Sequence, residues 1–244
     1  MTLSLRTALA DAVILWRTDR DLMVRIAGVF VLLPMLAIGL LATTIAIDPA
    51  AQPEQIRAAV SAFYSANLIA VVAISLTLEF GTLMLLNLYL QRGRSVGEML
   101  RASGLRLLPW VLLVMANGAI LQLGFALFIV PGVYIFGRTW LMGPAYVAEP
   151  TRGLFGAIER GFRLSAGNGW RVAVLAFGTG VVLAAAVLVL LILVQGIVAA
   201  LGGHPLVHAV LLVPVAAAGA AAFVFFTLVR IAAYRRLGGS INGM

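Results

Sequence analysis

Residues 128–171 read FIVPGVYIFGRTWLMGPAYVAEPTRGLFGAIERGFRLSAGNGWR, and this stretch decides the fold. Pro131 and Gly132 predict a tight turn, because proline suits the first turn of a helix, where its missing N–H is not needed. The apolar run that follows is long enough to cross a membrane and contains one charge, Arg138. A sharp exit and a basic helix along the membrane surface come next. We expect the rest of the chain to consist of variations of this unit.

The composition predicts a protein that lies in lipid. The chain is 63% apolar and 11% charged, with a mean hydropathy of +1.09. A soluble protein is about 45–50% apolar and about 25% charged, so a soluble fold has no place for this much apolar surface. The sequence has no cysteine, which excludes disulfides, thiolate catalysis and cysteine-ligated metals.

The charge favours membrane lipids over nucleic acid as the partner. All 17 basic residues are arginine, and the formal net charge is +8. The arginines flank apolar runs and do not form the face of a domain, so anionic phospholipid headgroups are the expected partner, with a membrane protein as a further one. The sequence indicates no cofactor and no metal.

Six apolar segments are long enough to span a bilayer, which takes about 20 helical residues. They are residues 22–47, 62–91, 107–128, 131–148, 172–201 and 205–233. We therefore expect an all-α, polytopic membrane protein whose six transmembrane helices form three hairpins, each preceded by an amphipathic interfacial helix. The whole chain, 1–244, is expected to be one membrane domain. The first segment is too long for a cleaved signal peptide and is expected to remain as a span.

The arginines also predict the orientation. With the N-terminus inside, Arg57 is the one arginine on the outer flanks, and the inner flanks hold most of the others. This asymmetry is the positive-inside rule, so both termini should be cytoplasmic in a multi-pass protein of the bacterial inner membrane.

Two similar short strings suggest an internal repeat. Gly97-Glu-Met-Leu-Arg101 precedes the third span, and Gly156-Ala-Ile-Glu-Arg160 precedes the fifth. A threefold parallel repeat follows, with units 1–91, 92–148 and 149–236. Ser95-Val-Gly-Glu98 fits a capping box and should start a helix.

Glu79 and Arg138 are the ionisable residues expected deep within the spans. A charge there is costly and needs a partner. Their depths from the inner flanks are roughly 20 and 16 Å at 1.5 Å per residue, so we expect an ion pair between the second and fourth spans. The pair would either fix the register of the helices, or line a polar path or bind an anionic group.

Several residues are expected to shape the elbow between the fourth span and the basic helix, or to contact lipid headgroups. Glu149 should accept a hydrogen bond from Arg160 or Arg163 and so hold the elbow. The elbow residues are Pro131, Gly132, Pro144, Glu149, Arg160 and Arg163. The expected headgroup contacts are Arg92, Arg94, Arg101, Arg106, Arg152, Arg171, Arg235 and Arg236.

Other polar and small residues favour structural roles. His204 and His208 have the spacing of a metal-ligand pair, but no further ligand accompanies them, so they are expected to be interfacial. A small-residue stripe, Ala176, Gly180 and Ala184, predicts close packing of the last hairpin or a dimer contact. No catalytic motif is present.

The region resembles a known family on a set of residues between 130 and 170. They are Val130-Pro-Gly-Val-Tyr134, Arg138, Pro144-Ala145, Val147-Ala-Glu149, Ala157-Ile-Glu-Arg160, Arg163-Leu-Ser-Ala-Gly167 and Trp170. The string resembles a family of bacterial six-helix inner-membrane proteins of uncharacterised function, and is similar to the membrane domain of some glycerophosphodiester phosphodiesterases. The family usually has serine where Gly161 stands. The chain has no room for the phosphodiesterase barrel, so the resemblance implies a fold and not that activity.

We therefore expect a non-enzymatic inner-membrane protein that organises or regulates membrane or lipid-linked partners. The alternative is a small transporter or lipid-translocating protein that uses a polar site at Glu79 and Arg138. An intramembrane enzyme is a third reading. A wet cavity at these two residues would favour transport, and dry packing would favour the structural role.

Overall fold

The computed structural model describes residues 3–45, 51–91, 93 and 95–238. The chain is 89% helix, and no strand occurs within these described ranges. Arg92 and Arg94, two of the expected headgroup contacts, lie outside the described residues.

The helices follow one another with short connections. In chain order they are α1 (Leu5–Thr18), α2 (Arg20–Ala27), the π-turn η1 (Gly28–Leu32), α3 (Leu33–Ala42), α4 (Pro53–Ala66), α5 (Leu68–Leu90), α6 (Val96–Leu127), α7 (Ile129–Thr139), α8 (Met142–Ala148), the 3-10 turn η2 (Pro150–Arg152), α9 (Gly153–Leu164), α10 (Gly169–Ala200) and α11 (Pro205–Leu237).

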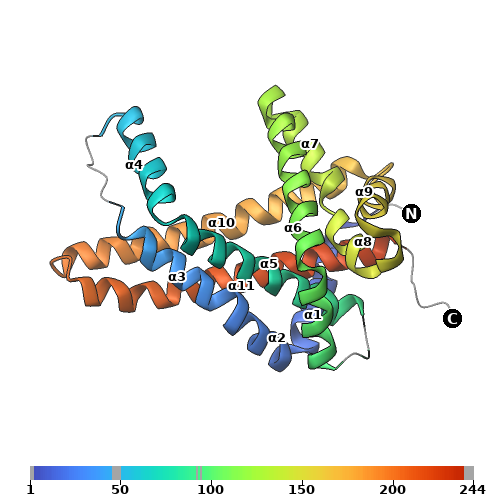
Figure 1. Ribbon diagram of the computed structural model, residues 1–244, viewed down its shortest axis with the longest axis horizontal. Coiled ribbons are helices and arrows are strands. Elements are labelled where there is room, and N and C mark those ends of the chain that lie inside the picture. Colours follow the sequence, from blue (N-terminus) through green and yellow to red (C-terminus); the bar gives the residue numbers. More distant parts are fainter. Residues whose placement is uncertain (1–2, 46–50, 92, 94, 239–244) are drawn as a thin grey trace.

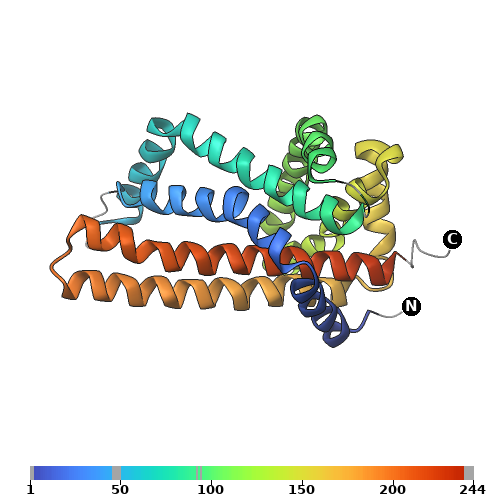
Figure 2. The ribbon, with the colours of Figure 1, turned by 90° about the horizontal axis from the view of Figure 1, so that it is seen from below.

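The long helices α3, α5, α10 and α11 run side by side along the longest dimension of the molecule (Figure 1, Figure 2). The α6–α7 hairpin projects away from them at a steep angle in Figure 1 and is seen nearly end-on in Figure 2. We call one side of the molecule the arginine-rich side. It comprises α1, α2, the first turns of α6, α9, the start of α10 and the end of α11, and lies at the right and bottom of Figure 1.

Five helical segments are long and apolar enough to cross a membrane, within the part of the chain that the structure describes. They are Arg20–Ala42, Leu68–Leu90, Val96–Leu127, Gly169–Ala200 and Pro205–Leu237. Each corresponds to one of the expected spans. The fourth expected span, residues 131–148, is interrupted and forms two shorter helices, α7 and α8.

Pro144 explains the interruption. A proline has no backbone N–H, so the carbonyl four residues earlier, at Trp140, has no helical donor. Instead, the Nε–H of Arg230 on α11 donates to the Trp140 carbonyl oxygen. The helix therefore ends at Thr139 and restarts at Met142, and a side chain from the last helix satisfies the freed carbonyl.

Three other boundaries differ from the sequence expectation. The second expected span loses its first residues, because the chain turns at Asn67 and residues 53–66 form the separate helix α4. The expected interfacial helix at 95–107 is continuous with the third span; the capping box at Ser95 starts this single long helix, α6. The turn expected at Pro131 and Gly132 lies at Phe128, in extended backbone, and both residues belong to α7.

Close approaches of backbone fix the hairpin and its neighbours. A Cβ on Gly132 would lie 2.4 Å from the ring of Phe125 on α6, and a Cβ on Gly137 would lie 2.5 Å from the backbone of Ala173 on α10. These two glycines let α7 pack against α6 on one face and against α10 on another. Glycine is needed at these positions for lack of space, not for an unusual backbone angle.

The buried side chains form two separate clusters. The larger cluster joins α1, α2, α5, α6, α8, α9, α10 and α11 on the arginine-rich side. A small second cluster, Val194, Val198 and Val215, lies near the far end of the α10–α11 pair. Between them α10 has no buried residue from 177 to 193. In the middle of the last hairpin α10 is therefore without buried residues, whereas α11 has Ala216, Ala220 and Val224 buried there.

Candidate functional site

A buried polar cluster joins α5, α6, α8 and α11. The Nε1–H of Trp110 donates to Oε2 of Glu79 over 2.7 Å, and Trp110 is 2% exposed. The charge of Glu79 also acts on Arg230, the residue that holds the Trp140 carbonyl. The carboxylate therefore has a hydrogen-bond donor and a cation from two different helices, as a charge in apolar surroundings requires.

Gly143 makes room for this cluster. A Cβ at Gly143 would lie 2.5 Å from Nη2 of Arg230 and 2.8 Å from the Trp110 ring. The rings of Trp110 and Tyr146 are 6.0 Å apart, so α8 covers the cluster on this side. Pro144 interrupts the helix, and the short helix α8 that results places Gly143 against the guanidinium of Arg230.

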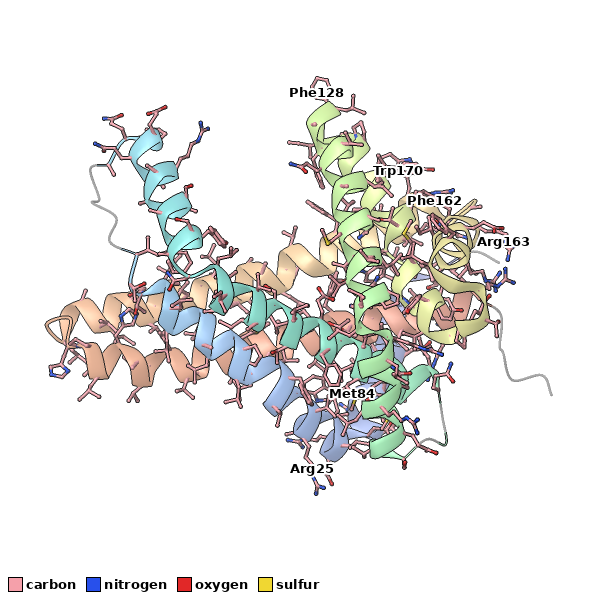
Figure 3. The ribbon with its side chains drawn as sticks, in the orientation of Figure 1. Arg25, Met84, Phe128, Phe162, Arg163 and Trp170 are labelled. Atoms are coloured by element: carbon pink, nitrogen blue, oxygen red, sulfur yellow. The ribbon has the colours of Figure 1, made fainter. Side chains whose placement is uncertain are left out.

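Arg138 lies elsewhere, and the expected ion pair with Glu79 is absent from the described structure. The Cζ atom of Arg138 is 5.6 Å from the centroid of the Phe162 ring on α9, and its Cδ atom lies beside Gly169 at the start of α10. The expectation was wrong because the depth of Arg138 was counted along one continuous helix. That helix ends at Thr139, which places Arg138 next to α9; Figure 3 shows Phe162 and Trp170 in this region.

Glu149 is the centre of a second polar cluster, at the elbow. Its Oε1 accepts from Nε of Arg160 at 2.7 Å and from the Tyr234 hydroxyl at 3.1 Å, and its carboxylate also pairs with Arg152. The Arg160 contact is one of the two expected from the sequence. Arg163, the other, pairs with Glu159 at 3.6 Å.

The surroundings of Glu149 set its protonation. Burial alone would raise the pKa of this carboxyl, but the hydrogen bond and charge of Arg160, the hydroxyl of Tyr234 and the charge of Arg152 together hold the pKa below its ordinary value. The carboxylate therefore stays charged and ties η2, α9 and α11 to the end of α8.

Close packing supports the elbow around these contacts. A Cβ on Gly161 would lie 2.9 Å from the backbone nitrogen of Met142, so α9 lies directly on the start of α8. The Ser165 hydroxyl donates to the carbonyl of Arg138 at 3.2 Å. The glycine that stands where the resembled family has serine is thus the contact point of two helices in this chain.

The first helix is fastened to the last. Both oxygens of Asp11 accept from Arg236, at 2.6 and 2.9 Å, and the Leu3 N–H donates to the Asn168 side chain at 3.0 Å. The interfacial segment expected at the N-terminus is therefore held by protein contacts on one face, where Ala8 and Ala12 are buried.

The expected headgroup arginines divide into two groups. Arg101 and Arg171 are exposed. Arg152 and Arg236 are engaged by the carboxylates described above, the Nη2 of Arg235 donates to the carbonyl of Tyr89, and Arg106 has a buried Nη1. Arg152, Arg235 and Arg236 thus contribute to holding the arginine-rich side together.

Sequence reasoning did not single out Arg230 and Trp110. Arg230 lies five residues before Arg235 within an apolar run, so an arginine deep in a span was visible there. Trp110 lies on the helix that follows Glu79, and a buried tryptophan N–H needs an acceptor. These two features were the available signals.

The remaining predicted site is the histidine pair. Nε2 of His208 lies 3.2 Å from Nε2 of Gln195, and Nδ1 of His204 accepts from its own helix at Leu206. Within the described ranges no group of three or more His, Asp or Glu side chains is placed to hold a metal.

No family model, curated protein or solved structure matches this chain.

Proposed function

We propose that this chain is an integral protein of the bacterial inner membrane, without catalytic activity, that organises or regulates lipid-linked or membrane-embedded partners. The resemblance of residues 130–170 to a six-helix membrane family agrees with this role. The observation that carries the proposal is the construction of the arginine-rich side.

That side is a rigid platform with free cations on its rim. Glu149 joins η2, α9 and α11, and Asp11 joins α1 to α11. Within the bundle, the carboxylate of Glu79 is likewise engaged, by the N–H of Trp110. Exposed arginines such as Arg101 and Arg171 remain outside the platform, where they face headgroups or a partner. A scaffold needs this combination, whereas a transport path needs polar groups that face water.

The topology that we propose keeps both termini in the cytoplasm. The helix α1 and the end of α11 lie on the same side of the molecule (Figure 1), which supports an even number of complete crossings. Three hairpins open from this side: α2–α3 with α5, α6 with α7 and α8, and α10 with α11. The positive-inside rule places their open ends in the cytoplasm.

For the α6–α7 hairpin, we propose a topology that differs from the six crossings expected from the sequence. Its turn, from Leu127 to Pro131, has no hydrogen-bonding side chain, and Phe128 is 79% exposed. The N–H of Phe128 donates to the carbonyl of Gly124, and the Phe128 carbonyl accepts from the N–H of Gly132, so both backbone groups of the exposed Phe128 are paired within the chain. Because α7 has 11 residues, it rises about 16 Å, against about 30 Å of hydrocarbon. We propose that this hairpin ends within the lipid.

Site-directed labelling tests this topology, because the chain has no cysteine of its own. Gln55→Cys on α4 should react with a membrane-impermeant maleimide in intact cells, and Glu159→Cys on α9 only after permeabilisation. Phe128→Cys, at the tip labelled in Figure 3, should react in neither condition. Labelling of Glu159→Cys in intact cells would mean that the orientation is opposite to the one we propose. Labelling of Phe128→Cys from outside would mean that α6 and α7 reach the outer surface of the membrane.

Two measurements test the role itself. Gentle extraction in native nanodiscs should retain phospholipid or a second membrane protein with the chain; a chain that emerges bare would contradict an organising role. In reconstituted vesicles with a fluorescent phospholipid in both leaflets, an external quencher should remove about half of the signal, because the protein does not move lipid. Complete quenching in sealed vesicles would show lipid translocation instead.

A further inference from the structure

The middle of the last hairpin contains an apolar groove that no side chain fills. It has a volume of about 620 Å³ and lies between α1, α10 and α11. Its lining is Val13, Trp16, Arg17, Leu183, Ala186, Val187, Ala218, Ala221, Ala222 and Phe225. Val13, Ala186 and Ala221 are exposed, so the groove is open at the surface of the molecule and can admit a ligand from the surrounding lipid.

Small residues form the floor of the groove. Ala218, Ala221, Ala222 and Phe225 are spaced three and four residues apart and so lie on one face of α11. Ala186 faces them from α10. Methyl side chains here leave the depth of a larger residue open, and the surface they present is purely apolar.

The groove follows α11 from Ala218 to Phe225, over which the helix rises about 10 Å. The half-thickness of the hydrocarbon core is about 15 Å, so the groove is long enough to hold much of one leaflet's acyl chain. A separate apolar groove of about 460 Å³, lined by Met35 of α3, lies on the other side of the contact between Val187 and Ala222.

The mouth of the groove carries a cation and an amphipathic ring. Arg17 is exposed and forms no ion pair with any residue that the structure describes, whereas Arg236, on the neighbouring end of α11, is neutralised by Asp11. Trp16, beside it, is half-buried and is the residue type that sits at headgroup level. Both lie on α1, on the arginine-rich side, where the bilayer surface is expected.

We infer that this groove binds one anionic phospholipid, with an acyl chain along α10 and α11 and the phosphate on Arg17. The lipid completes the packing that α10 lacks between the two buried clusters. Charge complementarity selects this occupant. A second copy of the chain would bring the same cation to the mouth, and the phosphate of a zwitterionic lipid is already balanced by the lipid's own ammonium group, whereas an anionic phospholipid brings a net negative charge to Arg17. The inference rests on the lipid partnership of the proposed function and assigns it a place.

Native mass spectrometry of delipidated protein in detergent, titrated with phosphatidylglycerol and separately with phosphatidylcholine, tests the site. One equivalent of phosphatidylglycerol should bind in preference to phosphatidylcholine. Arg17→Gln should weaken that binding about fivefold, the worth of one basic residue at an anionic surface. Ala186→Leu should weaken it through the groove; because Ala186 is exposed, the added side chain has room to fit without disturbing the fold.

Matched controls separate the groove from general effects. Arg20→Gln removes the same charge from a nearby exposed position, and Ala185→Leu adds the same side chain to α10 outside the groove. Both should bind like the unaltered protein. Equal binding by all variants would overturn the groove while leaving the lipid partnership intact. No anionic preference in any variant would overturn both. A dimer that Ala186→Leu converts to a monomer would overturn the lipid as the occupant.

Discussion

The hairpins α6–α7 and α10–α11 are similarly apolar but are built in opposite ways. The α6–α7 pair is tight along its length, with Gly132 against Phe125, and its turn is wholly apolar. The α10–α11 pair has a turn of Gly202, Gly203 and His204, and its two helices enclose grooves in their middle. Hydrophobicity alone therefore indicates that a hairpin lies in lipid; the turn and the packing indicate how far it reaches and what it holds.

The returning helix of each hairpin also carries an arginine among apolar residues, Arg230 on α11 and Arg138 on α7, and these two arginines differ in their surroundings. Arg230 on α11 holds the Trp140 carbonyl and lies in the field of Glu79. Arg138 on α7 lies over the Phe162 ring. Arg230 thus belongs to the polar cluster of four helices, whereas Arg138 contacts an aromatic ring of α9. This difference gives the largest predicted effect.

Arg230→Met should be the most damaging change, with a loss of about 3–5 kcal/mol, because it leaves the Glu79 charge without its cation and the Trp140 carbonyl without a donor. Arg138→Met should cost about 1 kcal/mol, the value of a contact between a cation and an aromatic ring. Thermal melting in detergent measures both. A double-mutant cycle of Glu79→Gln with Arg230→Met should show coupling, and the cycle of Glu79→Gln with Arg138→Met should not. Coupling of the second pair alone would restore the partnership expected from the sequence.

An arginine introduced at the tip of each hairpin should have the next largest effect and should distinguish the two hairpins. Phe128→Arg places a guanidinium in lipid and should cost about 2.5–3.5 kcal/mol. Leu201→Arg, at the end of α10, reaches water and should change little. The measurement is the fraction of each variant that inserts and remains folded in vesicles. Similar tolerance of both changes would mean that the two tips lie at the same depth.

Gly137→Ala should cost about 1–3 kcal/mol, because the new methyl group meets the backbone of α10 and the helices must separate. Gly178→Ala, on α10 with open space around it, is the control and should be neutral or slightly stabilising. The comparison uses melting temperatures in the same detergent. A harmless Gly137→Ala would show that α7 does not pack on α10 this closely.

The smallest effect concerns the elbow and depends on pH. Because the pKa of Glu149 is lowered in the folded protein, its stabilisation is present above the ordinary value of 4.5 and is lost as the pH falls through the lowered value. Glu149→Gln should lose about 1 kcal/mol at neutral pH and should converge with the unaltered protein in acid. The readout is the difference in melting temperature between pH 7 and the acid limit of stability. A difference that grows in acid would contradict the assignment.

Composition and helix-end signals predict most of the secondary structure. The apolar runs locate five long helices, and the Ser95 capping box marks the start of α6 correctly, because such features act over one or two turns. The threefold repeat stays a prediction. Position within the bundle was harder to predict, since it depends on where helices end. Pro144 was recognised as a boundary, but a missing N–H at 144 ends the helix at Thr139, and that shift moved Arg138 away from Glu79.

The two polar clusters also differ in how far their contacts could be predicted from the sequence. Glu149 and Arg160 are 11 residues apart on two sides of one bend, so their meeting follows from local geometry. The Glu79 cluster brings together α5, α6, α8 and α11, and its members are separated by up to 151 residues along the chain, from Glu79 to Arg230. The periodicity of the sequence does not predict contacts between residues so far apart in the chain. The unpaired acceptor at Trp140 becomes visible only when the break in the helix is known.

The dependence of the Trp140 carbonyl on Arg230 has a consequence for biogenesis. Arg230 belongs to α11, which is synthesised after the other helices described above, so a nascent chain that has inserted these helices but not α11 carries an unpaired backbone acceptor within the bilayer. Helix α1 also depends on α11, through Asp11 and Arg236. Assembly of these helices is thus completed only when α11 joins them, and a chain that stops short of α11 presents quality-control proteases with an unfinished core.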